Sequence, residues 1–378
     1  MVMAKLHFLL LCTGAPSRHL VKALKDRGHT YEQHDPRDLY LFVSESENGY
    51  DRIYNGSSKL ETPVRLKAGS FNAVISRIGA ELAHGAAILR HINENLGIYS
   101  AQDADGLETA SNKLKTTQRL SSSGLKVPKT IYGKQVAHIQ FVIDKLNGLP
   151  AVAKLLQGSQ GKGVMLLETK LAANTMLESF YKLNASLKIQ RFIDAKGKDI
   201  RAIVVGDQVA VAMERTSNKG DFRANISQRG SGRKIELSAA DKKICIEAAK
   251  ACDLEFAGVD LMKDEKGNSY IVEVNGNPGT KIIDLTEHNY FVDLVKFIET
   301  NVGTETEESE DRDTKPAPSG TDDQDEAEAR AVANRIERVA MAYQQCQYIS
   351  KADVAFMAEH GCSNLLEGPR SSVFGGRS

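Results

Sequence analysis

The amino-acid sequence predicts an α/β layer followed by a larger α+β region, and three observations indicate this fold class. Over residues 1–100, short apolar runs alternate with helical patterns, which is typical of a parallel sheet covered by helices. Over residues 101–300, short strands joined by tight turns predominate. The chain has 378 residues, 41% hydrophobic and 26% charged, which is the composition of an ordinary globular protein of two or three domains.

The first hundred residues predict strands at 6–12 and 72–79 and helices at 19–28 and 86–97. Gly28 and Gly97 lie where helix C-caps are expected. The apolar start resembles a signal peptide faintly, but the apolar run is short and interrupted by His7, so a buried first strand is the preferred interpretation. No apolar run approaches the ~20 residues that a membrane span requires, so no membrane partner is expected.

The next two hundred residues predict a strand-rich arrangement. Strands are expected at residues 127–133, 149–156, 163–168, 187–193, 199–214 and 268–275, and helices at 110–124 and 241–254. Within 199–214, Gly206 and Asp207 mark the turn of a hairpin.

Charge is distributed unevenly along the chain. Lys plus Arg and Asp plus Glu each number 49, and this zero net charge argues against a dedicated nucleic-acid binder. Residues 301–330 hold eleven acidic and three basic residues, and residues 1–300 are left with a net charge of +7, which fits an anionic substrate as well as scattered surface charge. We therefore expect a disordered acidic linker at 301–329, then a helix and flexible tail at 330–378.

The five cysteines form no C-x-x-C pair and are odd in number, so neither a disulfide framework nor a zinc site is expected. Reduced thiols indicate a cytoplasmic protein.

A glycine-rich segment at 151–168 is the first candidate site. An apolar strand carries Lys154 and runs into Gly158, Gly161 and Gly163. Glycines allow backbone N–H groups to approach phosphates. A strand follows rather than a helix, which excludes a Walker A motif and weakens a dinucleotide-binding interpretation. A plain hairpin stays possible, but a lysine within an apolar strand needs an anionic partner, and a nucleotide phosphate is one.

Two further segments carry candidate ligands. Residues 198–232 concentrate four arginines that either clamp phosphate or carboxylate groups or form a solvated basic face: Arg201, Arg215, Arg223 and Arg229. Residues 256–279 hold Asp260, Glu273 and Asn275, whose oxygen atoms suit Mg²⁺. Glu273 and Asn275 alternate on one strand and so share a face. Turn roles for Asp260 and Asn275 are the alternative, but carboxylates within apolar strands favour metal.

These blocks resemble the ATP-grasp superfamily and, within it, the RimK-like glutamate ligases. The stretches that carry the resemblance are SRIGAELAHGAAILR, NKLKTTQRL, VAKLLQGSQGKGV, DIRAIVVG, GDFRAN, AGVDLM and VEVNGNPG. They occur in the family's order and span residues 1–300. The resemblance implies an ATP-grasp fold with an N-terminal Rossmann-like (pre-ATP-grasp) domain at 1–100, an N-lobe at 101–188 and a C-lobe at 189–300.

The resemblance also implies roles for particular residues, and we state these roles as expectations. The nucleotide would be bound by Lys113, Lys154, Gly158, Ser159, Gly161, Gly163, the hinge Gln190, Arg191, Phe192 and Ile193, and by Asp199 at the ribose with Arg201 nearby. Lys154 and Arg215 would serve catalysis, with Arg215 facing the transferred phosphoryl group. Asp260, Glu273 and Asn275 would hold two Mg²⁺ ions, for which Mn²⁺ can substitute. Arg223 and Asn225 would lie toward the acceptor. Arg191 departs from the family, whose members commonly carry Glu there.

The implied reaction is ATP-dependent formation of a peptide bond. ATP converts a carboxylate into an acyl phosphate, which an amine then attacks. We expect L-glutamate as the amine and the C-terminal carboxylate of a peptide or protein as acceptor, in a homo-oligomer. The resemblance does not cover residues 301–378, which either recruit a partner or serve as a spacer.

Three alternatives compete with this interpretation. They are a ligase of free amino acids or small metabolites, a nucleotide-binding regulatory protein without turnover, and an NAD-dependent dehydrogenase. The metal triad argues against the second, and the single glycine at Gly14 argues against the third.

Overall fold

The computed structural model describes residues 5–43, 52–57, 61–79, 81–133, 138–155, 163–182, 185–217, 231–302 and 357. The chain divides into two compact units, Met1–Thr306 and Glu307–Ser378. All elements named below belong to the first unit. Residues 303–329 of the predicted linker, and the predicted C-terminal helix and tail apart from Met357, lie outside the described residues.

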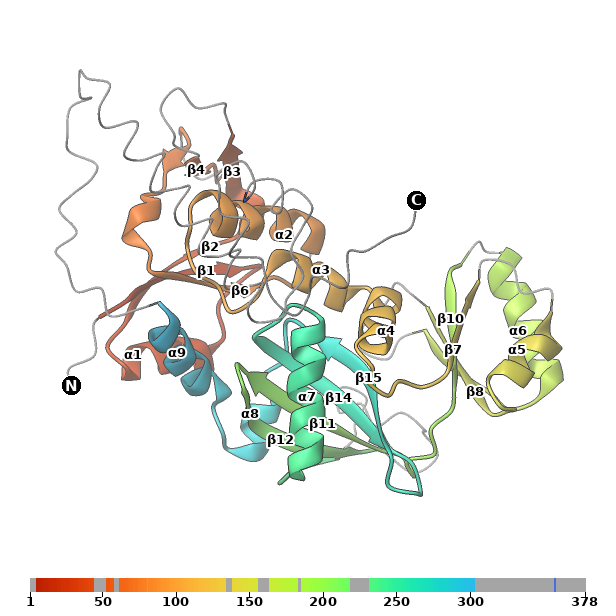
Figure 1. Cartoon of the computed structure of the whole chain (residues 1–378). Helices are drawn as coiled ribbons and strands as arrows, with labels where there is room; N and C mark the ends of the chain where they lie inside the picture. Colours follow the sequence, from red (N-terminus) through yellow and green to blue (C-terminus); the bar gives the residue numbers. More distant parts are fainter. Residues whose placement is uncertain are drawn as a thin grey trace, which may run out of the picture. The chain divides into compact units, whose positions relative to one another are not determined.

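A three-stranded parallel sheet forms the N-terminal layer, in the order β2-β1-β6 (Figure 1). Its strands are β1 (His7–Cys12), β2 (Thr30–His34) and β6 (Ala73–Arg77), with helix α1 (Arg18–Asp26) between the first two. Phe8 and Leu10 are buried in one core, and Leu9 and Leu11 in another. Because both faces of β1 are covered, its sequence is a continuous apolar run rather than an alternating one.

The helices and strands predicted for this layer are confirmed. The second helix begins earlier than expected, as α2 (Leu82–Arg90), and continues into a π-helical turn, η3 (His91–Asn95). Gly28 and Gly97 both have positive φ, as expected for residues that follow a helix. A small sheet that the sequence did not predict lies between β2 and β6 in the chain, with the short helical turns η1 (Pro36–Asp38) and η2 (Ala68–Ser70) and the antiparallel strands β3 (Leu39–Phe42), β4 (Arg52–Asn55) and β5 (Val64–Arg65).

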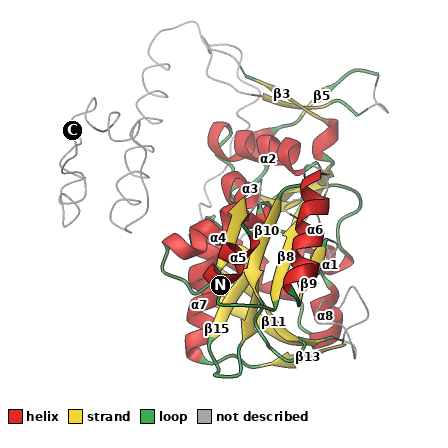
Figure 2. Cartoon of the chain, turned by 90° about the vertical axis from the view of Figure 1, so that its right-hand side faces the viewer, coloured by secondary structure: helices red, strands yellow, loops and turns green. Residues whose placement is uncertain are grey.

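A four-stranded antiparallel sheet has the order β7-β10-β8-β9. It comprises β7 (Thr130–Gly133), β8 (Ala151–Leu155), β9 (Val164–Leu167) and β10 (Leu187–Arg191), with helices α5 (Ile139–Lys145) and α6 (Lys170–Lys182) along one face (Figure 2). Ala153, Leu177 and Ile189 belong to the core between that face and the helices. Lys154 and Lys188 alternate with these core positions and so belong to the opposite face. The boundary that was predicted between the N-lobe and the C-lobe, at residues 188 and 189, falls within β10.

A five-stranded antiparallel sheet has the order β13-β12-β11-β14-β15. It comprises β11 (Lys198–Val205), β12 (Gln208–Thr216), β13 (Ser231–Ile235), β14 (Phe256–Lys263) and β15 (Ser269–Asn275), and the helices of this region are α7 (Ala239–Ala251), α8 (Lys281–Thr286) and α9 (Tyr290–Asn301). The hairpin predicted at 199–214 is confirmed as β11 and β12, with Gly206 in the turn at φ +55°. Figure 1 shows α7 lying across this sheet, and its contacts with β11, β12, β14 and β15 agree.

The helix predicted at 110–124 is confirmed as α4 (Lys113–Ser122), but it begins three residues later than expected. Residues 110 and 111 belong instead to the end of α3 (Ala104–Ser111), and Asn112 between the two helices has an extended backbone. The Asn112 side chain accepts hydrogen bonds from the N–H groups of Leu114 and Lys115. Asn112 therefore caps α4, which stabilises a helix start at the place where the sequence alone predicted a helix interior.

Two hydrophobic cores connect the parallel sheet to the five-stranded sheet. One contains Phe8 and Leu20 together with Phe291 and Ile298 of α9, and the other contains Leu9 together with Ala202 of β11. The strands of the candidate site are thus built on a layer that includes the first strand of the chain. No helix among the described residues is long and apolar enough to cross a membrane.

We expect Gly106→Ala to lower the free energy of unfolding by about 1–3 kcal/mol, because overpacking forces the backbone to shift. A methyl group at Gly106 would lie 2.5 Å from the carbonyl oxygen of Asp253 and 2.7 Å from that of Cys252. Urea unfolding of both proteins measures the loss. Gly69→Ala is the matched control, since a methyl group there meets nothing within 4 Å. Equal losses in the two variants would contradict the close approach of α3 to the end of α7.

Candidate functional site

Two carboxylates and an amide meet at the paired strands β14 and β15. Asp260 lies directly opposite Glu273, and Gly258 lies opposite Asn275. Since residues directly opposite in an antiparallel pair share a face, Asp260, Glu273 and Asn275 all project from one side of the sheet. The Asn275 Nδ2 donates to the Gly258 carbonyl oxygen at 3.3 Å. The structure thus brings together the three residues predicted as metal ligands.

The Asp260 carboxylate is buried between two guanidinium groups. Arg201 donates to both of its oxygens at 2.7 Å, and Arg215 Nη2 lies 2.9 Å from Oδ2. Burial alone would raise the pKa of Asp260, but the two arginines outweigh burial and lower the pKa to about 2. Asp260 is therefore ionised throughout the physiological range.

Asp199 completes a network of two carboxylates and two guanidinium groups. It lies opposite Arg215 on the neighbouring strand and accepts a bidentate pair of hydrogen bonds, with Arg215 Nη2 at 2.7 Å from Oδ2. Burial, with a smaller contribution from Asp260, raises the pKa of Asp199 although Arg215 opposes the shift. For Arg215, the two carboxylates outweigh the effect of burial and raise its pKa. Arg215 is 5% exposed, so it is held almost wholly inside this network.

Three lysines gather at the face of the four-stranded sheet that α5 and α6 leave uncovered. Lys154 of β8 lies directly opposite Lys188 of β10. Lys188 is 1% exposed and donates to the Lys113 carbonyl oxygen at 3.0 Å and to Thr117 Oγ1 at 2.9 Å. Burial, with the nearby Lys154, lowers the pKa of Lys188 to about 7. Burial also lowers the pKa of Lys154, while Glu273 opposes that shift.

Lys188 is a residue of this cluster that the sequence analysis missed. The strand containing it was predicted, but its lysine was not singled out. The available signal was the one used for Lys154, a lysine within an apolar strand. Glu273 affects the pKa of both Lys154 and Lys188. These lysines of the four-stranded sheet therefore lie near a carboxylate of the five-stranded sheet.

The predicted hinge supplies a buried acceptor. Gln190 is 2% exposed, its Nε2 donates to Thr130 Oγ1 at 2.8 Å, and its Oε1 is buried without a hydrogen-bond partner among the described residues. The backbone N–H groups of Arg191 and Phe192 donate to the carbonyl oxygens of Lys129 and Pro150 at 2.9 and 3.3 Å. A buried orphan acceptor suits a ligand that carries an amino group, as adenine does.

The remaining predicted site residues are placed less fully. Gly163 has φ +77°, a conformation that favours glycine. The predictions for Gly158, Ser159, Gly161, Arg223 and Asn225 lie outside the described residues.

Within the described ranges there is no group of three or more His, Cys, Asp or Glu side chains that could hold a metal. Two carboxylates and one amide are a smaller set, of the kind that Mg²⁺ accepts when phosphates and waters complete its shell.

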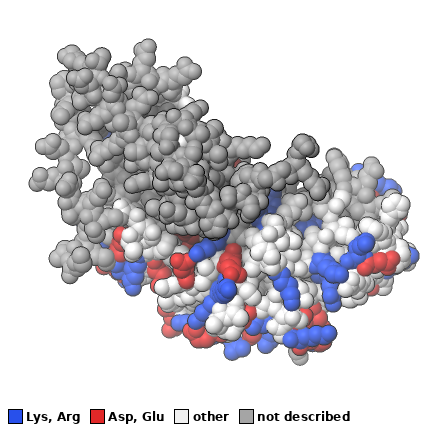
Figure 3. Space-filling view, in the orientation of Figure 1, with Lys and Arg blue, Asp and Glu red and all other residues white. Residues whose placement is uncertain are grey.

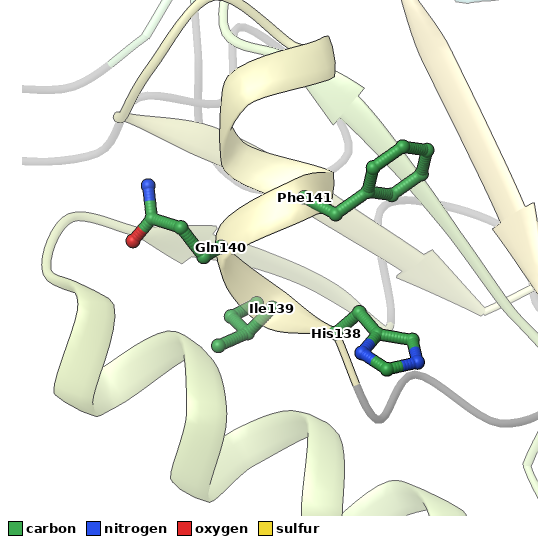
Figure 4. Close-up of a pocket in the computed structure, with 4 residues that line it drawn as sticks. All are labelled: His138, Ile139, Gln140 and Phe141. Atoms are coloured by element: carbon green, nitrogen blue, oxygen red, sulfur yellow. The ribbon is translucent and has the colours of Figure 1, made fainter.

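The surface gives little further indication of a site. Positive and negative side chains are interspersed over the described part of the face in Figure 3, with no large region of one sign. A shallow pocket at the start of α5 is lined by His138, Ile139, Gln140 and Phe141 (Figure 4), and none of the predicted site residues lines it. The cations of the candidate site are mostly buried, and so do not form a surface patch.

Comparisons with known proteins identify relatives over most of the chain. The family described as "RimK-like ATP-grasp domain" matches residues 110–298. A protein of Shewanella sp. (strain W3-18-1), named probable alpha-L-glutamate ligase 2, is 35% identical over 289 residues, which are 76% of this chain and 92% of the relative.

Solved structures share the fold at lower identity. The ATP-grasp ligase PsnB, solved with a phosphomimetic variant of its minimal precursor, Mg and ADP, matches with a TM-score of 0.60 at 17% identity, over 80% of this chain and 100% of the other. A RiPP-associated ATP-grasp ligase of Chryseobacterium gregarium, solved with ADP and a leader and core peptide, matches with a TM-score of 0.59 at 16% identity, over 79% and 96%.

We expect Asp199→Asn to lower the free energy of unfolding by about 3 kcal/mol, because it leaves two buried guanidinium groups to share one carboxylate. Urea unfolding at neutral pH measures the effect. Asp26→Asn is the control, since it removes a pair with Lys22 in which both side chains are at least half exposed, and its cost should be below about 1 kcal/mol. If the free energy of unfolding falls no more than in the control, the charges of Asp199, Arg215, Asp260 and Arg201 do not stabilise one another as a network.

Because the pKa of Lys188 is lowered in the folded protein, we expect the free energy of unfolding to increase as pH rises. Between its folded pKa of about 7 and the ordinary value of 10.5, the unfolded chain holds a proton that the folded chain has lost, so the free energy of unfolding rises with pH. The rise is at most ~1.4 kcal/mol per pH unit. Urea unfolding at about pH 7 and about pH 9 should show a smaller rise for Lys188→Met than for the unmodified protein. The exposed Lys243→Met should leave the rise unchanged, and an unchanged rise in Lys188→Met would refute the assignment.

Proposed function

Because this chain belongs to the RimK-like ATP-grasp family and is an ATP-dependent ligase, we propose that it adds L-glutamate to the C-terminal carboxylate of a peptide or protein through an acyl phosphate. The name of the Shewanella relative supports glutamate as the amino acid. The peptide and precursor complexes of the two structural neighbours support a peptide or protein acceptor.

The observation that carries the proposal is the placement of buried cations beside paired carboxylates. Lys154 and Lys188 lie side by side on one sheet, and their pKa values respond to Glu273 of the other. A buried lysine pair is unfavourable unless an anion is bound, and the phosphates of ATP supply that charge. Glu273 and Asp260 supply oxygen atoms that suit the accompanying cations.

In this proposal the described residues bind and orient ATP. Lys113 and Lys154 contact the phosphates, and the buried Gln190 Oε1 accepts from the adenine amino group. Asp260, Glu273 and Asn275 would hold two Mg²⁺ ions, for which Mn²⁺ can substitute. Bound magnesium neutralises charge on phosphate oxygens during transfer. Arg215, which binds Asp199 and Asp260, would contact the transferred phosphoryl group.

The acceptor carboxylate cannot react directly with an amine, because the leaving group would be oxide. Transfer of the γ-phosphoryl group to it forms the acyl phosphate and releases ADP. The glutamate amine, once deprotonated, then attacks the acyl carbon, and phosphate leaves. Buried guanidinium groups near the reacting atoms stabilise the negative charge that develops on oxygen.

The test is ADP release from Mg-ATP with each of the twenty amino acids, with and without a macromolecular fraction as the source of acceptor. We expect release that requires both L-glutamate and the macromolecular fraction, because both substrates of the ligation must be present. Mass spectrometry of the acceptor should show added glutamyl residues. A chelator of divalent cations should abolish release, and added Mg²⁺ should restore it.

Other outcomes would redirect the assignment. Release with free amino acids or small metabolites alone would indicate a small-molecule ligase. Release that depends on a different amino acid would retain the ligase chemistry and reject glutamate.

A further inference from the structure

Arg77 ends β6 at the carboxyl edge of the parallel sheet. It lies opposite Cys12, the last residue of β1. The carboxyl edge of an open parallel sheet is where ligands commonly bind, because the loops that leave the strands surround a crevice there. The sequence analysis used the segment around Arg77 only as a predicted strand and as part of the family resemblance, and the proposed reaction does not involve this residue.

The Arg77 guanidinium is shielded from water and has no anionic partner among the described residues. Its Nη2 donates to the Pro278 carbonyl oxygen at 2.8 Å, and its central carbon lies 5.3 Å from the centre of the Phe291 ring. Its Nη1 is buried and makes no hydrogen bond within the described part of the chain. Burial lowers the pKa of Arg77, which is the expected effect of removing a cation from water without pairing it.

The titratable groups nearest to Arg77 are neutral at physiological pH. These are the Tyr290 hydroxyl, which lies within hydrogen-bonding reach of the guanidinium, and the Cys12 thiol. Burial raises the pKa of Tyr290 to about 12 and that of Cys12 to about 11. Arg201 and Arg215, by contrast, are bound to carboxylates. A buried guanidinium without such a partner is costly, and a bound anion would remove that cost.

A second buried polar atom lies in the segment that Arg77 contacts. Asn277 Nδ2 donates to the Ile78 carbonyl oxygen at 3.1 Å, whereas its Oδ1 is buried with no hydrogen-bond partner among the described residues. Asn277 precedes Pro278, whose carbonyl oxygen binds Arg77. The neighbouring residues 77–78 and 277–278 therefore present one unused donor, on Arg77, and one unused acceptor, on Asn277.

This pair of atoms adjoins the candidate site. Asn277 follows Asn275 by two residues on the segment that leaves β15. The Tyr290 hydroxyl, which donates to the Pro278 carbonyl oxygen at 3.1 Å, is affected electrostatically by both Arg77 and Arg201. Arg201 in turn binds Asp260. A group bound at Arg77 would thus lie beside the network that includes Asp260, one of the predicted metal ligands.

From these contacts we infer that Arg77 binds a carboxylate of a substrate and that Asn277 Oδ1 accepts an N–H from the same molecule. This inference rests on the proposed function, which supplies two molecules with that chemistry: the amino acid and the peptide that accepts it. A guanidinium fork recognises a carboxylate better than the single ammonium of lysine does.

The test compares Arg77→Gln and Arg77→Lys with the unmodified protein in the ADP-release assay. The amino acid and the acceptor are varied separately at saturating Mg-ATP. We expect KM for one of these substrates to rise roughly 10- to 100-fold, as for loss of a charged hydrogen bond, with KM for ATP unchanged. A rise in KM for the amino acid identifies the amino-acid carboxylate as the group that Arg77 binds. A rise in KM for the acceptor identifies the carboxylate of the peptide instead.

Arg90→Gln is the matched control, because Arg90 is already paired with Asp105 and Glu108. Calorimetric titration with a non-hydrolysable ATP analogue confirms that each variant is folded. If Arg77→Gln fails to bind the analogue, the KM values of Arg77→Lys are used to test the inference. Unchanged KM values for both carboxylate substrates in the folded variants would overturn the inference.

A separate measurement distinguishes failure of the inference from failure of the proposed function. If the unmodified protein releases no ADP with any amino acid, thermal unfolding is compared in sodium acetate and in sodium chloride at equal ionic strength. We expect acetate to raise Tm above its value in chloride for the unmodified protein but not for Arg77→Gln. Equal shifts in both proteins would overturn the carboxylate site itself.

Discussion

Buried charge must be balanced within the sheet, and the four groups Asp199, Arg215, Asp260 and Arg201 meet this requirement on three neighbouring strands. Removing two carboxylates and two guanidinium groups from water is costly, and the cost is offset only because each group finds partners of opposite sign at hydrogen-bond distance. The balance depends on the register of β11 against β12 and β14. Any slip by one residue would move these side chains to the opposite face.

Lys154 and Lys188 of the four-stranded sheet are arranged differently, because among the described residues their positive charge is not balanced by carboxylates to the same degree. Lys188 relies on the neutral oxygen atoms of Thr117 and Lys113. Burial shifts the pKa of both Lys154 and Lys188 downward, which is the expected response of cations without sufficient counter-charge. The five-stranded sheet therefore neutralises its own buried charge, whereas the four-stranded sheet would gain stability from the polyanion that the proposed function assigns to it.

The sequence was sufficient to predict the ranges of β8, β10, β11, β12 and β15, because each is an apolar run bounded by turn residues, and it indicated a strand around Asp260 without giving its range. It was insufficient where structure depends on long-range pairing. The bulge at Asp260 and Leu261, and the bond of Arg201 to Asp260 across 59 residues, follow from sheet register, which periodicity does not specify. Helices α5 and α6 and the small sheet β3-β4-β5 were not predicted. The break at Asn112 was missed because Ala110, Lys113 and Leu114 near it are good helix formers. The roles of individual site residues remain predictions.

The packing of α9 has a consequence for the order in which the chain folds. Phe8 and Leu20 share a core with Phe291 and Ile298, so the first strand and first helix are completed by one of the last elements of the unit. At ordinary rates of synthesis, on the order of 10–50 s separates the two contributions. During that interval the apolar face of β1 is exposed on the ribosome-bound chain. Residues 8–12 of β1 are buried in the finished protein and are thus a segment that a chaperone would protect during translation.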